Sequence, residues 1–272
     1  MHLSVDQLDR VELTLVTGIK AFMAECGFKQ AHLGLSGGID SALVAYLASR
    51  AIGAENVVCF GMPSRFSSQS STDDAAEMAA NIGLSFQVLP IEDIYTAFIS
   101  TLEPVFQGRP FDIAEENVQS RIRGTLMMAF ANKFGSMLMS TGNKSEISMG
   151  YCTLYGDTAG ALAPIGALFK TEVFALCERI NERAKSSGGR EIIPRAIIDK
   201  PPSAELRPNQ KDEDSLPPYS VLDQILRMHT RDGLSRRDIA EKGWNDDLVG
   251  RIVETVAASR FKQRQMPPVI DL

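Results

Sequence analysis

Short apolar runs alternate with longer segments of helical period through about the first 160 residues of the chain. The short runs predict strands at 31–35, 56–61, 85–89 and 136–141. The longer segments predict helices at 6–26, 40–50, 73–81 and 115–134. Strands that are separated by helices pair in parallel through right-handed crossovers. We therefore predict an α/β fold with a doubly wound, Rossmann-like, mostly parallel sheet and helices on both faces.

The alternation fades in the second half of the chain. Helical periods there predict helices at 170–185, 220–230, 235–241 and 245–259, which make a helical C-terminal part. Residues 186–190 and the proline-rich run 200–218 lack either period and are predicted loops. A loop as long as 200–218 is either functional, such as a lid, or a disordered linker. With no internal repeat and 272 residues, we predict one domain over 1–272.

The clearest chemical signal lies between the first predicted strand and the helix that follows it. The candidate phosphate loop comprises Gly34, Leu35, Ser36, Gly37, Gly38, Ile39, Asp40 and Ser41. A helix N-terminus offers free backbone N–H groups and a favourable dipole to an anion, and glycines let the backbone approach it closely. The serines add hydroxyl donors, and Asp40 is placed to hold Mg²⁺. The alternative is a plain glycine turn with a Ser/Asp helix cap.

Composition and charge narrow the possible partners and the compartment. A net charge of −6 argues against nucleic acid, whose partners usually carry a basic surface. The four cysteines (Cys26, Cys59, Cys152 and Cys177) form no C-x-x-C pair, which favours reduced thiols over a disulfide or zinc site. The N-terminus lacks a signal-peptide pattern, and the most apolar stretch, 158–169, is too short to span a membrane. We expect a cytoplasmic protein.

Several separated motifs carry a resemblance to a known family. Ser36-Gly37-Gly38-Ile39-Asp40-Ser41 resembles the signature of the N-type ATP pyrophosphatases, and it is not a Walker A loop because no Gly-Lys-Ser/Thr follows. Within that superfamily, the downstream motifs look like those of the NAD synthetases: Glu116–Gly124, Ser140–Glu146, Tyr151–Asp157, Phe169–Thr171, Lys200–Leu206 and Phe261–Gln265. The resemblance covers nearly the whole chain in order.

The resemblance implies roles for individual residues. It implies that ATP is bound by the phosphate loop (Gly34–Ser41) together with Thr141, Lys170 and Ser203. It implies that Asp40 and Glu146 hold Mg²⁺, and that these two and Lys170 are the catalytic residues. Asn117, Arg121 and Lys262 are assigned by it to the dinucleotide substrate. Asn117 and Arg121 are four residues apart and share a helix face, yet without the resemblance the sequence favours a solvated or salt-bridged role for Arg121.

The implied activity is that of an NAD⁺ synthase, a carbon–nitrogen ligase. The nicotinate carboxylate of deamido-NAD would attack the α-phosphorus of ATP, giving an adenylated intermediate and pyrophosphate, and ammonia would then release AMP and NAD. NAD synthetases are homodimers, so the face of the 115–134 helix that carries Met127, Met128 and Phe130 is either core or subunit contact.

The resemblance extends to two groups of NAD synthetases, which differ in their nitrogen donor. Glutamine-dependent NAD synthetases carry an N-terminal amidase domain that this sequence lacks, which makes free ammonia, or ammonia from a separate amidase, the expected donor. Leu154 stands where the short ammonia-dependent enzymes usually have a substrate-binding lysine. Lys211–Tyr219 and Arg264–Pro268 look more like the synthetase domain of the glutamine-dependent group. The chain would be a stand-alone relative of that domain, favoured because Met1 precedes a complete helix, or a piece of a longer protein.

Two rival functions remain open on the sequence. A tRNA-modifying pyrophosphatase would need a basic groove and usually sulfur-transfer cysteines, and the sequence offers no pattern for either. An ATP-binding module of the universal-stress type would share the doubly wound sheet. That second interpretation does not explain Thr141, Glu146 and Lys170 at their spacing.

Overall fold

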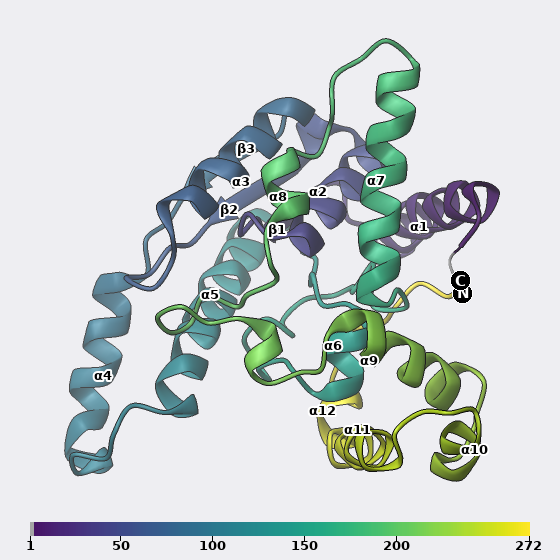
Figure 1. Cartoon of the computed structure of the whole chain (residues 1–272). Helices are drawn as coiled ribbons and strands as arrows, with labels where there is room; N and C mark the ends of the chain where they lie inside the picture. Colours follow the sequence, from purple (N-terminus) through teal and green to yellow (C-terminus); the bar gives the residue numbers. More distant parts are fainter. Residues whose placement is uncertain (1–2) are drawn as a thin grey trace.

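A four-stranded parallel sheet forms the centre of the fold. The computed structural model describes residues 3–272, so the first two residues of the predicted domain lie outside it. The strand order is β3-β2-β1-β4, with β1 (Ala31–Gly34), β2 (Val57–Gly61), β3 (Ser85–Val88) and β4 (Met137–Leu138). Ala31 is in register with Val57 on one side and with Met137 on the other. The predicted doubly wound, parallel α/β fold is confirmed (Figure 1).

Alternate residues of the central strands bury against opposite helical layers. Leu33 and Cys59 belong to the large core cluster with α1 (Val5–Cys26), α2 (Ile39–Ile52) and α3 (Gln69–Ile82). Phe60 and Leu138 pack with Met127 of α5 (Ile113–Phe134) on the other face. A strand directs successive side chains to opposite faces, so these short apolar strands need cover on both sides. Met127 is therefore core, whereas Met128 is exposed.

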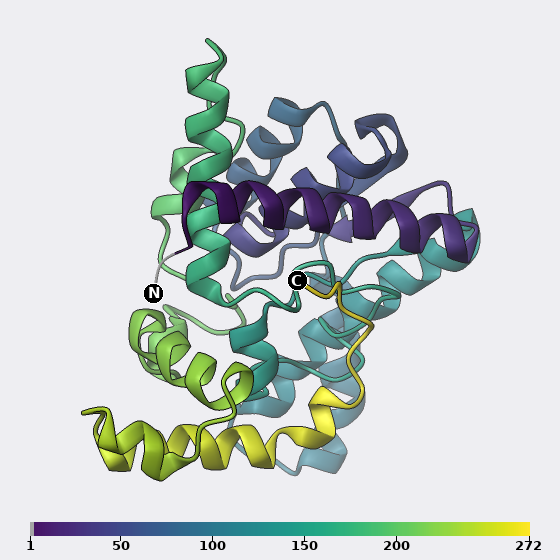
Figure 2. The ribbon, with the colours of Figure 1, turned by 90° about the vertical axis from the view of Figure 1, so that its right-hand side faces the viewer.

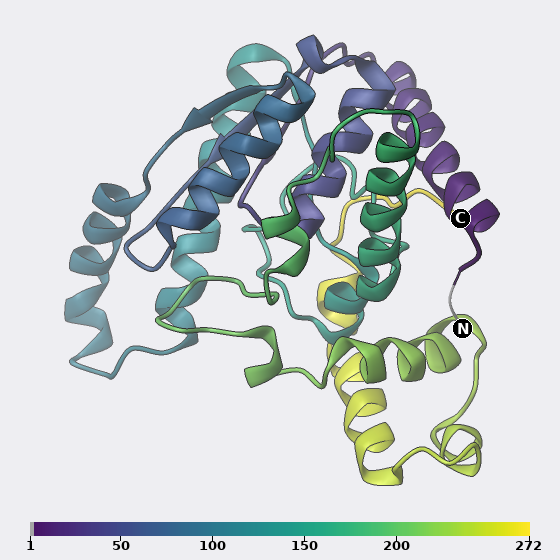
Figure 3. The same ribbon diagram turned by 45° about the horizontal axis from the view of Figure 1, so that its top comes forward.

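The C-terminal part adds a second, helical cluster beside the sheet. The later helices of the chain are α7 (Lys170–Ser186), α8 (Arg195–Asp199), α9 (Tyr219–Leu226), α10 (Arg236–Glu241), α11 (Asp246–Ala258) and α12 (Arg260–Gln263). Leu222, Ile239, Val249 and Ile252 form the centre of the second cluster. Figure 3 shows α9–α12, coloured green to yellow, gathered on one side of the rest of the molecule.

The C-terminal tail returns to the main core. Figure 2 shows this tail, in yellow, running from α12 toward α1. Ala163 bridges Val269, and Ile270 packs so closely on Gly18 of α1 that a Cβ there would lie 2.6 Å from its Cγ2 atom. The tail thus ties the helical part to the first helix.

Several elements differ from the sequence prediction. The helices α4 (Glu92–Phe106) and α6 (Lys144–Met149) were not predicted, although the apolar spacing in α4 is helical. Within the predicted strand 136–141, only the two residues of β4 form a strand. The next residue, Met139, makes only an isolated bridge to Leu162. The predicted helix 220–230 is α-helical to Leu226 and continues as a π-helical turn, η3 (Arg227–Arg231). Short 3₁₀ turns occur at η1 (Ala54–Asn56) and η2 (Asp212–Asp214).

No helix within residues 3–272 has the length and apolar character that a membrane crossing requires.

Candidate active site

The phosphate loop joins the carboxyl end of β1 to α2. Ser41 Oγ donates to the Gly38 carbonyl at 2.9 Å and accepts from the Ser36 amide at 3.2 Å, which folds the loop back on the helix N-terminus. Gly37 has a φ of 79°, and a Cβ on it would lie 2.2 Å from the carbonyl oxygen of Ser71 in α3. Glycine is therefore required at this position by both backbone conformation and space.

The loop lies at the point where the strand order reverses. β1 pairs with β2 on one side and with β4 on the other, and the chain after β4 leads into α6. In open α/β sheets, this crevice outside the carboxyl ends of the strands is the usual ligand site. The predicted residues Thr141 and Glu146 follow β4 at that edge.

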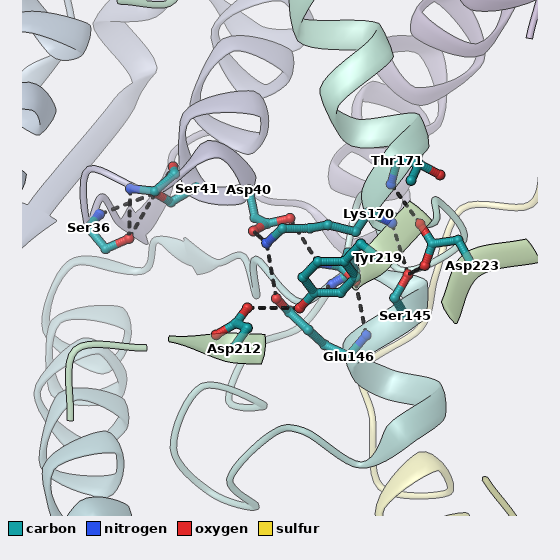
Figure 4. Close-up of polar contacts among 12 residues, drawn as sticks. Ser36, Asp40, Ser41, Ser145, Glu146, Lys170, Thr171, Asp212, Tyr219 and Asp223 are labelled. Carbon is teal, nitrogen blue, oxygen red and sulfur yellow. Dashed lines mark hydrogen bonds and ion pairs between the residues drawn. The ribbon is translucent and has the colours of Figure 1, made fainter. Parts of the chain in front are cut away.

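Asp40, Glu146 and Lys170 meet at one point, as Figure 4 shows. The Lys170 ammonium, on a side chain only 4% exposed, is paired with the Asp40 carboxylate and lies 3.3 Å from Glu146 Oε1. Asn143 caps α6 by accepting from the Glu146 amide at 3.0 Å, and its own amide group donates to Asp40 Oδ1 at 2.9 Å. Glu146 lies in the first turn of α6.

Burial and charge act together on these groups. Burial alone would lower the pKa of Lys170, but Asp40 and Glu146 outweigh it and raise that pKa. Burial raises the pKa of Glu146 to about 8, against the opposing effect of Lys170. Two carboxylates thus share one ammonium, and the second carboxylate tends to take up a proton. A bound cation would likewise neutralise the two carboxylates.

This donor set fits Mg²⁺. Mg²⁺ is commonly held by one or two carboxylates together with substrate phosphates and water. Residues 3–272 contain no cluster of three or more His, Cys, Asp or Glu side chains that could hold a metal without such help. Asp40 and Glu146 would therefore hold the ion jointly with a phosphate group.

Buried hydrogen bonds hold Lys170 in place. The Ser145 hydroxyl accepts from the Lys170 amide at 2.9 Å and donates to Asp223 of α9. Asp223 Oδ2 also accepts from the Thr171 amide at 2.7 Å. The start of α7 is consequently fixed to both α6 and α9, and the helical C-terminal part positions the lysine (Figure 4).

A cavity of about 320 Å³ connects these groups. Its lining includes every residue of the phosphate loop and also Thr141, Glu146, Lys170 and Ser203, so the structure brings together all the residues assigned to ATP and metal. The segment Lys200–Leu206 lies along the cavity. It is fastened to α3, because the Glu205 carboxylate accepts from Ser71 Oγ at 2.6 Å and Ser68 Oγ at 3.1 Å. This packing argues against a disordered linker at residues 200–206.

The residues assigned to the dinucleotide do not line this cavity but surround the adjoining segment 150–157. Asn117 accepts from the Thr153 hydroxyl at 2.7 Å, and Arg121 donates to the Leu154 carbonyl at 3.2 Å. Lys262 donates to the carbonyls of Gly150 and Cys152, both at 2.7 Å. The same segment contributes its later residues, Gly156 and Asp157, to the cavity lining.

Three cavity residues were missed by the sequence assignment. Arg123 donates to the Met62 carbonyl at 2.9 Å, and burial lowers the pKa of its guanidinium to about 10. Tyr151 and Asp212 lie near Glu146 and Lys170 on the cavity wall. All three fall inside the motifs that carry the family resemblance, which was the available signal.

Fold and site together define a class: a doubly wound α/β protein with a glycine loop at a helix N-terminus and an adjacent acid pair at the switch point of the sheet. The family model for NAD synthase matches residues 12–267, which is most of the chain. The chain belongs to the NAD synthase family.

Individual relatives refine this placement. A glutamine-dependent NAD(+) synthetase of Synechocystis sp. is 49% identical over 97% of this chain and 47% of its own length. The structure of glutamine-dependent NAD+ synthetase from Acinetobacter baumannii in complex with ADP has a TM-score of 0.70 and 38% identity, over 100% of this chain and 48% of that one. An NH3-dependent NAD synthetase from Campylobacter jejuni has a TM-score of 0.74 and 26% identity, over 97% and 99% of the two chains.

Two facts follow from these relatives. The predicted resemblance to the synthetase domain of the glutamine-dependent group is confirmed. The chain spans about half the length of the curated glutamine-dependent relatives that it matches.

Proposed function

We propose that this chain is an NAD⁺ synthase that amidates deamido-NAD at the expense of ATP. The observation that carries the proposal is the convergence of the phosphate loop, the Asp40–Glu146 pair and Lys170 on one cavity in a member of the NAD synthase family. The ADP complex of the A. baumannii relative supports ATP as the nucleotide. ATP would place its β- and γ-phosphates on the loop, with its α-phosphorus toward Lys170.

The residues of the cavity suit the two steps of the reaction. The substrate carboxylate attacks the α-phosphorus to form an acyl-adenylate and pyrophosphate, and ammonia then attacks the acyl carbon and displaces AMP. Mg²⁺, when bound by Asp40 and Glu146, supplies charge neutralisation on the phosphates. Lys170 supplies a further positive charge from a fixed position, so no side-chain nucleophile is required. Positioning and electrostatics account for catalysis.

Deamido-NAD would approach over the segment 150–157. Asn117 and Arg121 of α5 and Lys262 of α12 contact that segment, and Arg121 remains exposed at its edge. We propose these three as the residues of the dinucleotide site. The lid over the cavity, residues 200–218, would keep water from the acyl-adenylate, which would otherwise hydrolyse.

Ammonia is the proposed nitrogen donor. The C. jejuni relative is described as NH3-dependent, and the relatives of higher identity are described as glutamine-dependent. The same synthetase chemistry serves both when a separate amidase, on the same or another chain, releases ammonia. We propose that this chain uses ammonium in vitro and does not hydrolyse glutamine itself, and that it works in the cytoplasm.

A homodimer is the proposed assembly, and an exposed apolar face supports it. Figure 1 shows α4 and the start of α5 projecting from the sheet. This face carries Phe98, Val105, Phe111 and Ile113, which are 47–72% exposed. An apolar patch of this kind on a soluble protein usually marks an interface. Sedimentation of the wild type and of Val105→Glu tests the dimer, and a wild-type monomer would contradict it.

The decisive experiment measures NAD formation with ammonium or glutamine as the sole nitrogen source, together with pyrophosphate release from ATP. We expect NAD from ammonium alone, and pyrophosphate release that depends on deamido-NAD. Release that depends on tRNA would favour a tRNA-modifying pyrophosphatase. A complete lack of release would favour a nucleotide-binding module of the universal-stress type.

A further inference from the structure

The helix that carries Lys170 begins after a residue that cannot cap it. That residue is Phe169, whose side chain has no hydrogen-bonding atom. The first N–H groups of a helix have no partner within the helix and need acceptors from elsewhere. Ser145 and Asp223 accept from two of them. A third acceptor is Glu172 of α7 itself, whose Oε2 accepts from the Phe169 amide at 2.9 Å.

Two arginines of the π-helical turn η3 hold Glu172 and form an ion-pair cluster with it. Glu172 Oε1 accepts from Arg227 Nη2 at 2.6 Å and from Arg231 Nη1 at 3.2 Å. The same two guanidinium groups lie over the Phe169 ring, with their Cζ atoms 5.2 and 4.9 Å from its centroid. The Glu172 side chain is only 5% exposed, so its carboxylate is shielded from bulk water. The ion-pair cluster (Glu172, Arg227 and Arg231) therefore fixes the start of α7 to η3.

The helix α9 and the turn η3 form one continuous segment that reaches the start of α7 at two points. Figure 1 shows α9 at the lower end of α7, where Asp223 accepts from the Thr171 amide. The chain then widens into η3, in which the Asp232 amide donates to the Arg227 carbonyl five residues earlier, at 3.0 Å. Such isolated π-helical turns are frequent at functional sites.

The ion-pair cluster lies close to the reacting groups without touching the cavity. Glu172 and Lys170 lie in the same first turn of α7, and the Lys170 ammonium meets Asp40 and Glu146. None of the three residues of the cluster belongs to the cavity lining formed by residues 3–272. Any effect of the cluster on the reaction must therefore pass through the first turn of α7.

We propose that Glu172, held by Arg227 and Arg231, is a positioning residue for Lys170 in adenylate formation. The cluster keeps the first turn of α7 at the place where the lysine ammonium faces the α-phosphate. Positioning of this kind is sensitive, because a misplacement of about 1 Å can cost about 100-fold in rate. This assignment rests on the proposed function, since it presumes that Lys170 acts on the phosphates of ATP.

A double-mutant cycle tests the assignment. The assay is ATP–pyrophosphate exchange with radiolabelled pyrophosphate, which reports adenylate formation, requires deamido-NAD and needs no nitrogen donor. The four enzymes are the wild type, Glu172→Gln, Lys170→Gln and the double variant. Glu178→Gln is the matched control, because Glu178 also lies on α7 and pairs with Arg195 at 2.7 Å, yet is not part of the cavity lining formed by residues 3–272.

The expected result is a loss that depends on the lysine. Glu172→Gln should lower kcat for exchange about tenfold, with the KM for ATP within about twofold of the wild type, because the phosphate loop is unchanged. In the Lys170→Gln background the same substitution should cost less than about twofold, since no ammonium is left to position. Glu178→Gln should exchange at the wild-type rate.

Other outcomes overturn the assignment. Equal losses in the two backgrounds mean that Glu172 serves the stability of the fold and not Lys170. A kcat that stays within about twofold of the wild type in Glu172→Gln means that the lysine needs no such support. If Glu172→Gln or Lys170→Gln does not fold, Arg231→Gln or Lys170→Met takes its place in the cycle. A wild-type chain that shows neither exchange nor NAD formation refutes the proposed function, whereas an active wild type with equal losses refutes only the positioning role.

Discussion

Gly37→Ala should damage the phosphate loop while leaving all its hydrogen-bonding side chains intact. The new methyl group would lie 2.2 Å from the Ser71 carbonyl oxygen, well inside van der Waals contact, and Ser71 belongs to the first turn of α3. An alanine at a φ of 79° also costs about 1 kcal/mol in a left-handed conformation. The phosphate loop and α3 must therefore move apart to accommodate the methyl group.

The expected consequences differ for stability and for activity. We expect a loss of unfolding free energy of about 2–4 kcal/mol, the sum of strain and overpacking. A displacement at a site that works by positioning should slow ATP–pyrophosphate exchange by about 100-fold. Urea unfolding and the exchange assay measure the two effects separately.

Gly38→Ala is the matched comparison for stability. Gly38 has a φ of −94°, and its new Cβ would meet only the Ser36 hydroxyl, at 3.3 Å. Its cost in unfolding free energy should stay below about 1 kcal/mol. If Gly37→Ala proves as stable as Gly38→Ala and exchanges at the wild-type rate, the steric reasoning for this loop is wrong.

Three further predictions concern charge, pH and the lid. Asp40→Asn should slow pyrophosphate release by about 100-fold, near 3 kcal/mol of barrier, while circular dichroism stays unchanged; near-normal turnover would remove Asp40 from the metal role. Burial lowers the pKa of His32, whose ring contacts Ser136 Oγ and the Met127 carbonyl at 2.9 Å each. The unfolded chain therefore binds the proton more tightly, so unfolding free energy should fall as pH drops from 7 to 5, and less steeply in His32→Gln; equal slopes would contradict this. ATP with deamido-NAD should protect residues 200–218 from trypsin in timed digests, and unchanged cleavage would count against a lid.

Local patterns in the sequence were sufficient for the sheet and the phosphate loop. Each strand is a short apolar run, and the loop lies between one such run and a helix, so neighbouring residues determine both. The convergence of Asp40, Glu146 and Lys170 was predicted only through the family resemblance. No periodicity relates residues that are up to 130 positions apart.

Other features of the site depend on packing that the sequence does not display. Tyr151 and Asp212 look like ordinary residues of a turn and a charged loop, and their exposure to the cavity follows from how α6 and the segment 200–218 meet. The position of Asn117 and Arg121 outside the cavity likewise depends on the path of segment 150–157. The helix α4 was not predicted, although its apolar residues have helical spacing. Of the side chains of α4, only that of Tyr95 is buried.

The meeting of Asp40, Glu146 and Lys170 has a consequence for the order in which the protein matures. A nascent polypeptide that has emerged only through α6 would possess the glycine turn and both acids, yet it would lack the lysine and the α9 anchor that holds it. The two acids would then face each other without their counter-charge. Competence to bind nucleotide should therefore arise late in synthesis, after the C-terminal helices have docked, rather than with the segment that carries the recognisable signature.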